Sequence, residues 1–156
     1  IYDDPKWPSK PLLYVSATSK TDDTVAPKGK ENLVVLIPVA PDIEDTPNTR
    51  EKYFNLIMDK LEAFTGEDIR HHIITKRSYA HKEFIEDYHS FKGNAYGLAN
   101  TLLQTAILKP SLKNKKLKNL YYTGQLTVPG PGVPPSLISG EVVAKEIAKD
   151  FPIFKN

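Results

Sequence analysis

A loop rich in glycine and proline, set between a short β-forming stretch and an amphipathic helix, constrains this chain more than any other feature. Residues 124–135 contain three glycines and four prolines. Residues 121–123 (Tyr-Tyr-Thr) favour a strand before the loop. From Ser136 onward, apolar residues recur at helical spacing. The sequence therefore predicts a strand, a glycine loop and a helix over residues 120–148.

This order of elements is suited to binding an anionic or electron-rich group. Glycine lets a backbone approach a ligand closely. The first N–H groups of a helix have no partner inside the helix, and the helix dipole adds partial positive charge there. Because Pro134 and Pro135 carry no N–H, the donors expected at this end belong to Val133 and Ser136. The alternative is a rigid connection that binds nothing, and the residues alone leave both readings open.

The same stretch resembles the C-terminal signature of the bacterial-type phytoene desaturases, the FAD-dependent, amine-oxidase-like carotenoid desaturases. That family ends with a pattern of the form NLYxxGxxTxPGxGxPxxxxSGxxxA. The positions that match it in register are Asn119, Leu120, Tyr121, Gly124, Thr127, Pro129, Gly130, Gly132, Pro134, Ser139, Gly140 and Ala144. Such a long match is far more specific than an isolated glycine motif.

The resemblance implies that FAD is the cofactor and that this loop forms part of its site. The residues expected at the cofactor are Gly124, Gln125, Gly130, Gly132, Val133 and Pro134. Gly124 and Gln125 are expected to bring backbone N–H groups to the phosphate or ribityl chain. Gly132 and Val133 are expected to present the helix N-terminus to the C2 carbonyl of the flavin ring, and the other two to hold the turn.

A second segment, residues 87–110, resembles a family block in which a glycine loop re-enters the flavin domain. Its matching positions are Gly93, Ala95, Tyr96, Gly97, Leu98, Gln104 and Pro110. The resemblance implies that Tyr96, Leu98 and Gln104 contact the substrate; the alternative is that they are interdomain core. The family often has arginine before the proline, where this chain has Lys109. Lysine lacks the planar, bidentate hydrogen bonding of arginine, so Lys109 is given no role.

The rest of the sequence predicts further strands and helices. Strands are expected over residues 12–18 and 32–39, adjacent in one sheet, with both faces of the second strand covered because it is apolar nearly throughout. The intervening loop resembles a hairpin of the family's substrate-binding domain. A helix should begin at Thr46, the cap, and end at Gly66. Its apolar stripe, expected to face the core, consists of Tyr53, Phe54, Ile57, Leu61 and Phe64.

Residues 69–79 read as another strand, and residues 81–88 as one or two helical turns. The histidines all fall in or beside this region: His71, His72, His81 and His89. Their spacing does not favour a metal site, because adjacent residues of a strand point to opposite faces. No cysteine is present, which excludes disulfides and thiolate ligands.

The fold class expected is α/β, as the C-terminal part of a two-domain flavoprotein. Residues 1–91 should belong to a mixed, partly antiparallel substrate-domain sheet. Residues 92–156 should supply the last strand and helix of a Rossmann-like FAD domain. The chain starts at Ile1 and has no GxGxxG fingerprint for the pyrophosphate. We therefore expect the rest of the polypeptide, or a homo-oligomer partner, to cover apolar surface on these last elements.

The function implied for the whole enzyme is carotenoid (phytoene) desaturation by hydride transfer from a polyene hydrocarbon to flavin. The isolated piece is expected to be inactive, and no catalytic residue is assigned. Open alternatives are a carotenoid isomerase, a saturase, a desaturase of C30 or hydroxylated carotenoids, and a non-catalytic folding or interaction module. The net charge of +2 gives no signal for nucleic acid.

A cytoplasmic enzyme associated peripherally with a membrane is expected, since a carotenoid lives in the bilayer. Residues 109–118 carry five lysines. They read either as a solvated loop or as a contact with anionic lipid headgroups.

Overall fold

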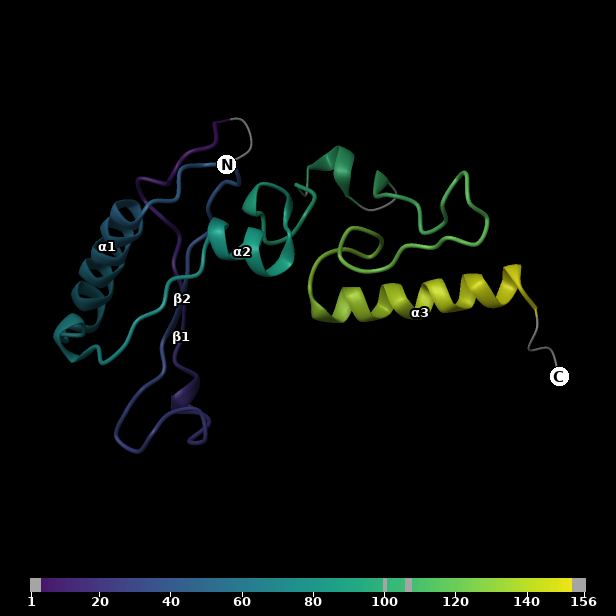
Figure 1. Cartoon of the computed structure of the whole chain (residues 1–156). Coiled ribbons are helices and arrows are strands. Elements are labelled where there is room, and N and C mark those ends of the chain that lie inside the picture. Colours follow the sequence, from purple (N-terminus) through teal and green to yellow (C-terminus); the bar gives the residue numbers. More distant parts are fainter. Residues whose placement is uncertain (1–3, 100, 106–107, 153–156) are drawn as a thin grey trace. The chain divides into compact units, whose positions relative to one another are not determined.

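The computed structural model describes residues 4–99, 101–105 and 108–152. The chain forms two compact units, Ile1–Asn94 and Ala95–Asn156. Within the described residues there are three α-helices and one two-stranded sheet, a small α/β arrangement (Figure 1). The division follows Asn94, whereas the sequence placed a boundary after Phe91. The assignment of the two parts to a substrate-binding and a flavin-binding domain stays a prediction.

The first unit contains a short antiparallel hairpin. Strand β1 (Tyr14–Ser16) pairs with β2 (Val34–Leu36), so the prediction that the two strands are neighbours is confirmed. Both strands are shorter than expected. Val34 and Leu36 are about half exposed, so the expectation that both faces of the second strand are covered is wrong in this structure. The reason is that the sheet of the described residues is a lone two-stranded hairpin, which buries little apolar surface on either face.

Helix α1 (Pro47–Thr65) has the ends that the sequence predicted. The Thr46 side chain accepts the N–H of Thr49 at 3.2 Å, and Gly66 closes the helix in the left-handed conformation at φ +76°. Its buried residues are Tyr53, Met58 and Leu61. Phe64, predicted to face the core, is 89% exposed, so that part of the prediction is wrong: residues 69 and 70 contact the last turn at Glu62 and leave Phe64 uncovered.

The strand predicted over residues 69–79 is wrong. Arg70–His72 forms a 3₁₀ turn instead, followed by irregular chain. One carboxylate oxygen of Glu62 accepts the N–H groups of Ile69 and Arg70 at 3.0 and 2.8 Å. Asp68 adds an interaction with the Nδ1 of His71 at 2.8 Å. These local carboxylate contacts satisfy the backbone donors that a strand would have used in a sheet.

Helix α2 (His81–Tyr88) confirms the predicted helical turns and is held by an ion-pair network. The guanidinium of Arg50, on α1, binds the Asp45 carboxylate at 2.6 and 2.7 Å and the Glu83 carboxylate at 2.7 and 2.8 Å. Buried His81 interacts through Nε2 with the Ala40 carbonyl oxygen at 2.7 Å. Gly93 lies directly against His81, since a Cβ added at Gly93 would meet the His81 Cβ at 2.7 Å.

The second unit is built around α3 (Val133–Asp150), which begins three residues before the position expected from the sequence. The strand predicted before the glycine loop is reduced to one antiparallel bridge, Lys113↔Tyr121. Ser139 and Val143 are buried on α3, while Val133 and Leu137 are 85% and 78% exposed. The expectation that these elements expose apolar surface is confirmed. In the described part of the chain, no helix has the length and apolarity needed to cross a bilayer.

Candidate functional site

The glycine loop before α3 is held in a fixed conformation by its own polar residues. Thr127 is 2% exposed, and its N–H and hydroxyl both donate to the Gly124 carbonyl oxygen, at 3.1 and 2.9 Å. The Val128–Pro129 peptide bond is cis. Gly130 and Gly132 have φ of +137° and +114°, a region that L side chains rarely adopt. Glycine is therefore required at these two positions by the backbone itself.

Ser139, in the second turn of α3, fastens the loop to the helix. Its Oγ is fully buried and accepts the Gly124 N–H at 2.7 Å. The hydroxyl donates to the Ser136 carbonyl at 2.6 Å and lies 2.8 Å from the Thr123 Oγ1. The Gly124 N–H is therefore used within the chain in this conformation. It does not supply the ligand donor that the sequence led us to expect.

The N-terminus of α3 corrects a second expectation about donors. Gly132 is the N-cap, and the Ser136 N–H donates to its carbonyl oxygen at 3.0 Å. Ser136 is thus already part of the helix hydrogen-bond ladder. Pro134 and Pro135 lie in the first turn, where the missing N–H costs nothing. Within the described residues, the N–H groups of Gln125 and Val133 donate no hydrogen bond, so these two remain as donors for a ligand.

An open groove in the second unit brings several predicted site residues together. It is lined by Tyr96, Gln125, Gly132, Val133, Ser136 and Leu137. Tyr96 was expected at the substrate, and Gln125, Gly132 and Val133 at the cofactor, so residues of both expected sites border one surface. Leu98 and Gln104, the other expected substrate residues, do not line this groove. Gly130 and Pro134, which were expected at the cofactor, are not among its lining residues, and Gly130 is buried.

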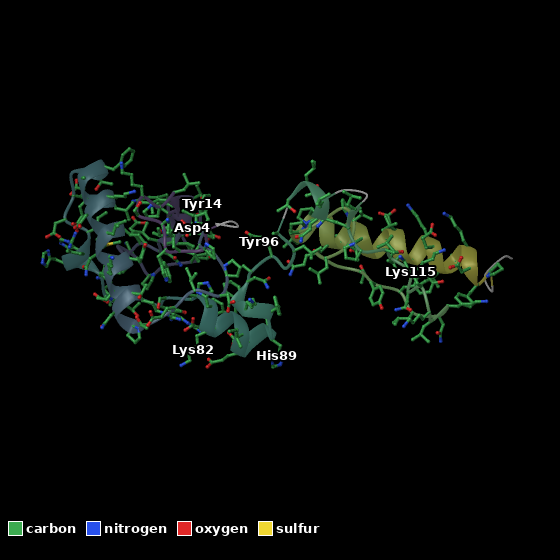
Figure 2. All side chains as sticks on the ribbon, turned by 90° about the horizontal axis from the view of Figure 1, so that it is seen from above. Asp4, Tyr14, Lys82, His89, Tyr96 and Lys115 are labelled. Carbon is green, nitrogen blue, oxygen red and sulfur yellow. The ribbon has the colours of Figure 1, made fainter. Side chains whose placement is uncertain are left out.

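The position of Tyr96 depends on the neighbouring glycine. Gly97 has φ +78°, and a Cβ added there would meet the Leu126 side chain at 2.2 Å. Gly97 therefore lies close against Leu126 of the glycine loop, and Tyr96, its neighbour in the sequence, lines the groove. Tyr96 itself is 59% exposed. Figure 2 shows Lys115 well away from Tyr96, and no lysine lines the groove.

The lysine-rich segment is divided between structural and solvated residues. The Lys113 ammonium binds Glu146 and Asp150 of α3, each at 2.9 Å, and these carboxylates hold the pKa of Lys113 above its usual range. Asp150 also accepts the Tyr121 hydroxyl at 2.5 Å and raises the pKa of that phenol. Lys115, Lys116 and Lys118 are exposed. Of the five lysines in this segment, only Lys115, Lys116 and Lys118 are exposed enough to contact an outside partner.

Lys109 is a residue of this unit that sequence reasoning left without a role. The residue is 9% exposed, and its Cε and Nζ lie 3.3 and 3.8 Å from the position of a Cβ on Gly130. The lysine thus lies under the glycine loop. The sequence did hold one indication of a role: Lys109 occupies a position at which the family often has arginine.

Known proteins match nearly the whole length of this chain. No protein-family model matches it. A carotenoid 3,4-desaturase from Haloarcula japonica is 43% identical over 151 residues, which is 97% of this chain and 30% of that protein. A 4,4'-diaponeurosporene oxygenase from Staphylococcus aureus is 36% identical over 143 residues, 90% of this chain and 29% of that protein. The chain spans about 30% of the length of these curated relatives.

The chain belongs to the carotenoid desaturase family. The resemblance drawn from the sequence is confirmed at this level. Within a carotenoid desaturase sequence, the structure gives physical reasons for several signature positions. Ser139 and Thr127 hold the loop through hydrogen bonds, and Gly130 and Gly132 meet a backbone requirement.

Proposed function

We propose that this chain is the C-terminal portion of an FAD-dependent carotenoid desaturase, an oxidoreductase that introduces double bonds into a polyene hydrocarbon. One observation carries the proposal: the glycine loop, the N-terminus of α3 and an exposed apolar surface border a single groove. The names of the two relatives, a carotenoid desaturase and a diaponeurosporene oxygenase, support a carotenoid as the substrate class.

The residues at the loop fit a flavin nucleotide. Gly130 and Gly132 give the loop backbone conformations that only glycine adopts readily, and the Val133 N–H has no partner in the described residues. Helix N-termini with free donors suit phosphates and other anionic groups. We assign Gln125, Gly130, Gly132, Val133 and Pro134 to the FAD site, with Gly124 as a structural part of the loop.

The chemistry that FAD supplies when bound is hydride acceptance: one polyene carbon loses a hydride, its neighbour loses a proton, and one double bond forms. The residues of this chain bind and orient. Tyr96, Val133 and Leu137 offer apolar surface on which a hydrocarbon is recognised by shape and burial. The N-terminal dipole of α3 favours negative charge at the loop and stabilises it as it develops.

The substrate is the finer part of the proposal. Phytoene is the substrate suggested by the sequence signature. The relative at 43% identity is named for desaturation at the 3,4 position of a carotenoid. That name favours, as the substrate, a carotenoid from a later step of the biosynthesis than phytoene. An isomerase or a saturase would use the same groove and is separated from a desaturase by its products.

The surroundings of the enzyme are also proposals. We assign the first unit to the substrate-binding domain and the second to a Rossmann-like FAD domain of a two-domain flavoprotein. The exposed apolar residues of α3 are then covered by the rest of the polypeptide or by a second copy. We place the enzyme in the cytoplasm, attached peripherally to a membrane. Exposed Lys115, Lys116 and Lys118 support an anionic lipid contact of about 1 kcal/mol each.

The test is product analysis with the whole protein that carries this chain. It should be produced in bacterial strains that accumulate phytoene or lycopene, and the pigments resolved by chromatography with mass detection. A desaturase gives products lighter by two hydrogens per step. Products of unchanged mass would identify an isomerase, and heavier products a saturase; either would overturn the desaturase assignment. Sedimentation with vesicles of anionic or neutral lipid tests the membrane contact, which predicts binding to the anionic vesicles alone.

A further inference from the structure

The two units carry formal charges of opposite sign, which the small net charge of the chain conceals. The first unit contains thirteen basic and sixteen acidic residues, and the second contains eight lysines, no arginine and three acidic residues. The formal charge is therefore −3 on the first unit and +5 on the second. Charge asymmetry of this kind indicates that an anionic partner meets the second unit.

The exposed positive charge of the second unit lies at the tip of a hairpin formed by residues 112–122. Lys113 and Tyr121 form its antiparallel bridge. Both side chains bind the Asp150 carboxylate near the end of α3, the ammonium at 2.9 Å and the hydroxyl at 2.5 Å. The base of the hairpin is thus fastened to the helix, and its tip, residues 115–118, has the sequence Lys-Lys-Leu-Lys.

Asn114 gives the tip a defined shape. Its Oδ1 accepts the backbone N–H groups of Lys116 and Leu117 at 2.8 and 2.9 Å. Its own N–H donates to the Leu120 carbonyl oxygen at 3.0 Å, across the hairpin. A surface that is ordered before it meets a partner loses less entropy on binding.

The three lysines of the tip are exposed, and their ammonium groups have no partner among the described residues. The acidic residues of this unit all lie on α3 and pair with Lys113, Lys145 and Lys149 instead. Lys115 and Lys116 border an open depression of the hairpin together with Lys113. The tip therefore offers uncompensated positive charge to an outside partner.

An exposed apolar side chain lies between these charges. Leu117, flanked by Lys116 and Lys118, is 55% exposed. Ammonium groups around an apolar side chain match the interface of a bilayer, where cations meet the headgroups and apolar groups reach the acyl chains. Recognition of phosphates in a fixed geometry typically uses arginine, which this unit lacks, so a diffuse anionic surface fits the tip better than a nucleic acid does.

We propose that residues 115–118 dock the whole protein on an anionic bilayer, with Leu117 entering the boundary between headgroups and acyl chains while the three lysines contact lipid phosphates. The inference rests on the proposed function, because a hydrocarbon substrate is held in a bilayer. It adds an apolar contact to the lysine contact proposed above. It also gives Lys113 a different part, since that residue fastens the docking hairpin to α3.

The first test removes the charge. The whole protein is sedimented with carotenoid-free vesicles of phosphatidylcholine alone or of an equal mixture with phosphatidylglycerol. The variant combines Lys115→Gln, Lys116→Gln and Lys118→Gln. The matched control removes three exposed lysines of the first unit, Lys10→Gln, Lys28→Gln and Lys30→Gln. Since each lysine contributes about fivefold, the tip variant should bind anionic vesicles about a hundredfold more weakly, and the control should bind as the wild type does.

The second test removes the apolar contact. Leu117→Ser keeps every charge and should weaken binding to the anionic vesicles about tenfold. Its control is Leu12→Ser, on a leucine that is 76% exposed in the first unit, which should change nothing. At about 1 M salt, where charges are screened, the wild type and the lysine variant should converge, while the effect of Leu117→Ser persists. Should the triple variant be unstable, Lys118→Gln alone should weaken binding about fivefold.

The proposal is overturned if the wild type does not bind anionic vesicles, or if either the lysine variant or Leu117→Ser binds them as the wild type does. Retention of the wild type by heparin without vesicle binding would assign the tip to a soluble polyanion and overturn it as well. Binding to these vesicles requires neither flavin nor carotenoid. A protein that docks as described but yields no desaturated product would count against the proposed function alone, so the two failures are distinguishable.

Discussion

The Oγ of Ser139 accepts the backbone N–H of Gly124 at 2.7 Å, and this bond joins the start of the glycine loop to the second turn of α3. The serine is completely buried. Its hydroxyl also contacts Thr123 and Ser136, so three segments meet at one atom. The loop that we assign to FAD is thereby positioned before any ligand binds.

Ser139→Ala tests this pre-positioning. Loss of the hydroxyl leaves the Gly124 N–H without its partner, and we expect a loss of about 1–3 kcal/mol in the free energy of unfolding. Retention of FAD by the whole protein should fall as well, because the loop is no longer fixed. Urea titration and flavin content are the measurements, with Ser9→Ala, on an exposed serine, as the control. Wild-type stability and flavin content in the variant would contradict the account.

Gly93→Ala tests the close approach of Gly93 to α2. Both Gly93 and Gly29 have positive φ, at +67° and +75°, but only Gly93 has atoms near its Cβ position, those of His81 at 2.7–2.9 Å. Gly29→Ala should therefore cost only the backbone strain, about 1 kcal/mol. Gly93→Ala adds overpacking and should cost about 2–4 kcal/mol. The fluorescence of Trp7, whose ring is 6.0 Å from His81, reports the unfolding in urea. Equal costs for the two variants would be inconsistent with the packing described.

Stability of the first unit should fall in acid through Glu83. Arg50 lowers the pKa of Glu83 from 4.5 to about 2 and also lowers the pKa of Asp45. Since the folded pKa lies below the unfolded one, the stabilisation is present above about pH 5 and is lost as the pH falls toward 2. Glu83→Gln should lower stability at pH 7 by about 2 kcal/mol and flatten its dependence on pH.

The measurement is the unfolding free energy between pH 2 and 7. Glu86→Gln serves as the control, since Glu86 is exposed and its nearest cation, Lys82, is 3.9 Å away. An identical pH slope for Glu83→Gln and the wild type would exclude Glu83 as a source of the acid sensitivity.

Features encoded by neighbouring residues were predictable from the sequence. Thr46, Pro47 and Gly66 gave the ends of α1, because capping depends on a few adjacent residues and on the left-handed conformation that glycine adopts easily. The glycine loop and α3 were likewise predictable from spacing.

Features that depend on partners were not predictable. The apolar pattern of β1 and β2 indicated a covered sheet, but no further strand of the described residues pairs with them. The strand expected over residues 69–79 does not form, because Glu62 and Asp68 bind this segment locally. Hydrophobic periodicity cannot predict such contacts.

The candidate site was predictable in part. The signature gave Gln125, Gly132 and Val133, which do share a groove with Tyr96. It could not tell that the Gly124 N–H is taken by Ser139, because the two are fifteen residues apart and meet only after the loop folds back on α3. The burial of Lys109 beneath Gly130 was missed for the same reason.

The most direct test of the account is the flavin content of the purified whole protein, wild type and Gly132→Val, from absorption spectra and intact mass. Valine cannot readily adopt φ +114° at the cap of α3. Gly29→Val, at another positive-φ glycine with open space around it, is the matched control. We predict about one FAD per chain in the wild type and in Gly29→Val, and none in Gly132→Val. Absence of flavin from the wild type, or normal flavin in Gly132→Val, would contradict the assignment of this loop to FAD.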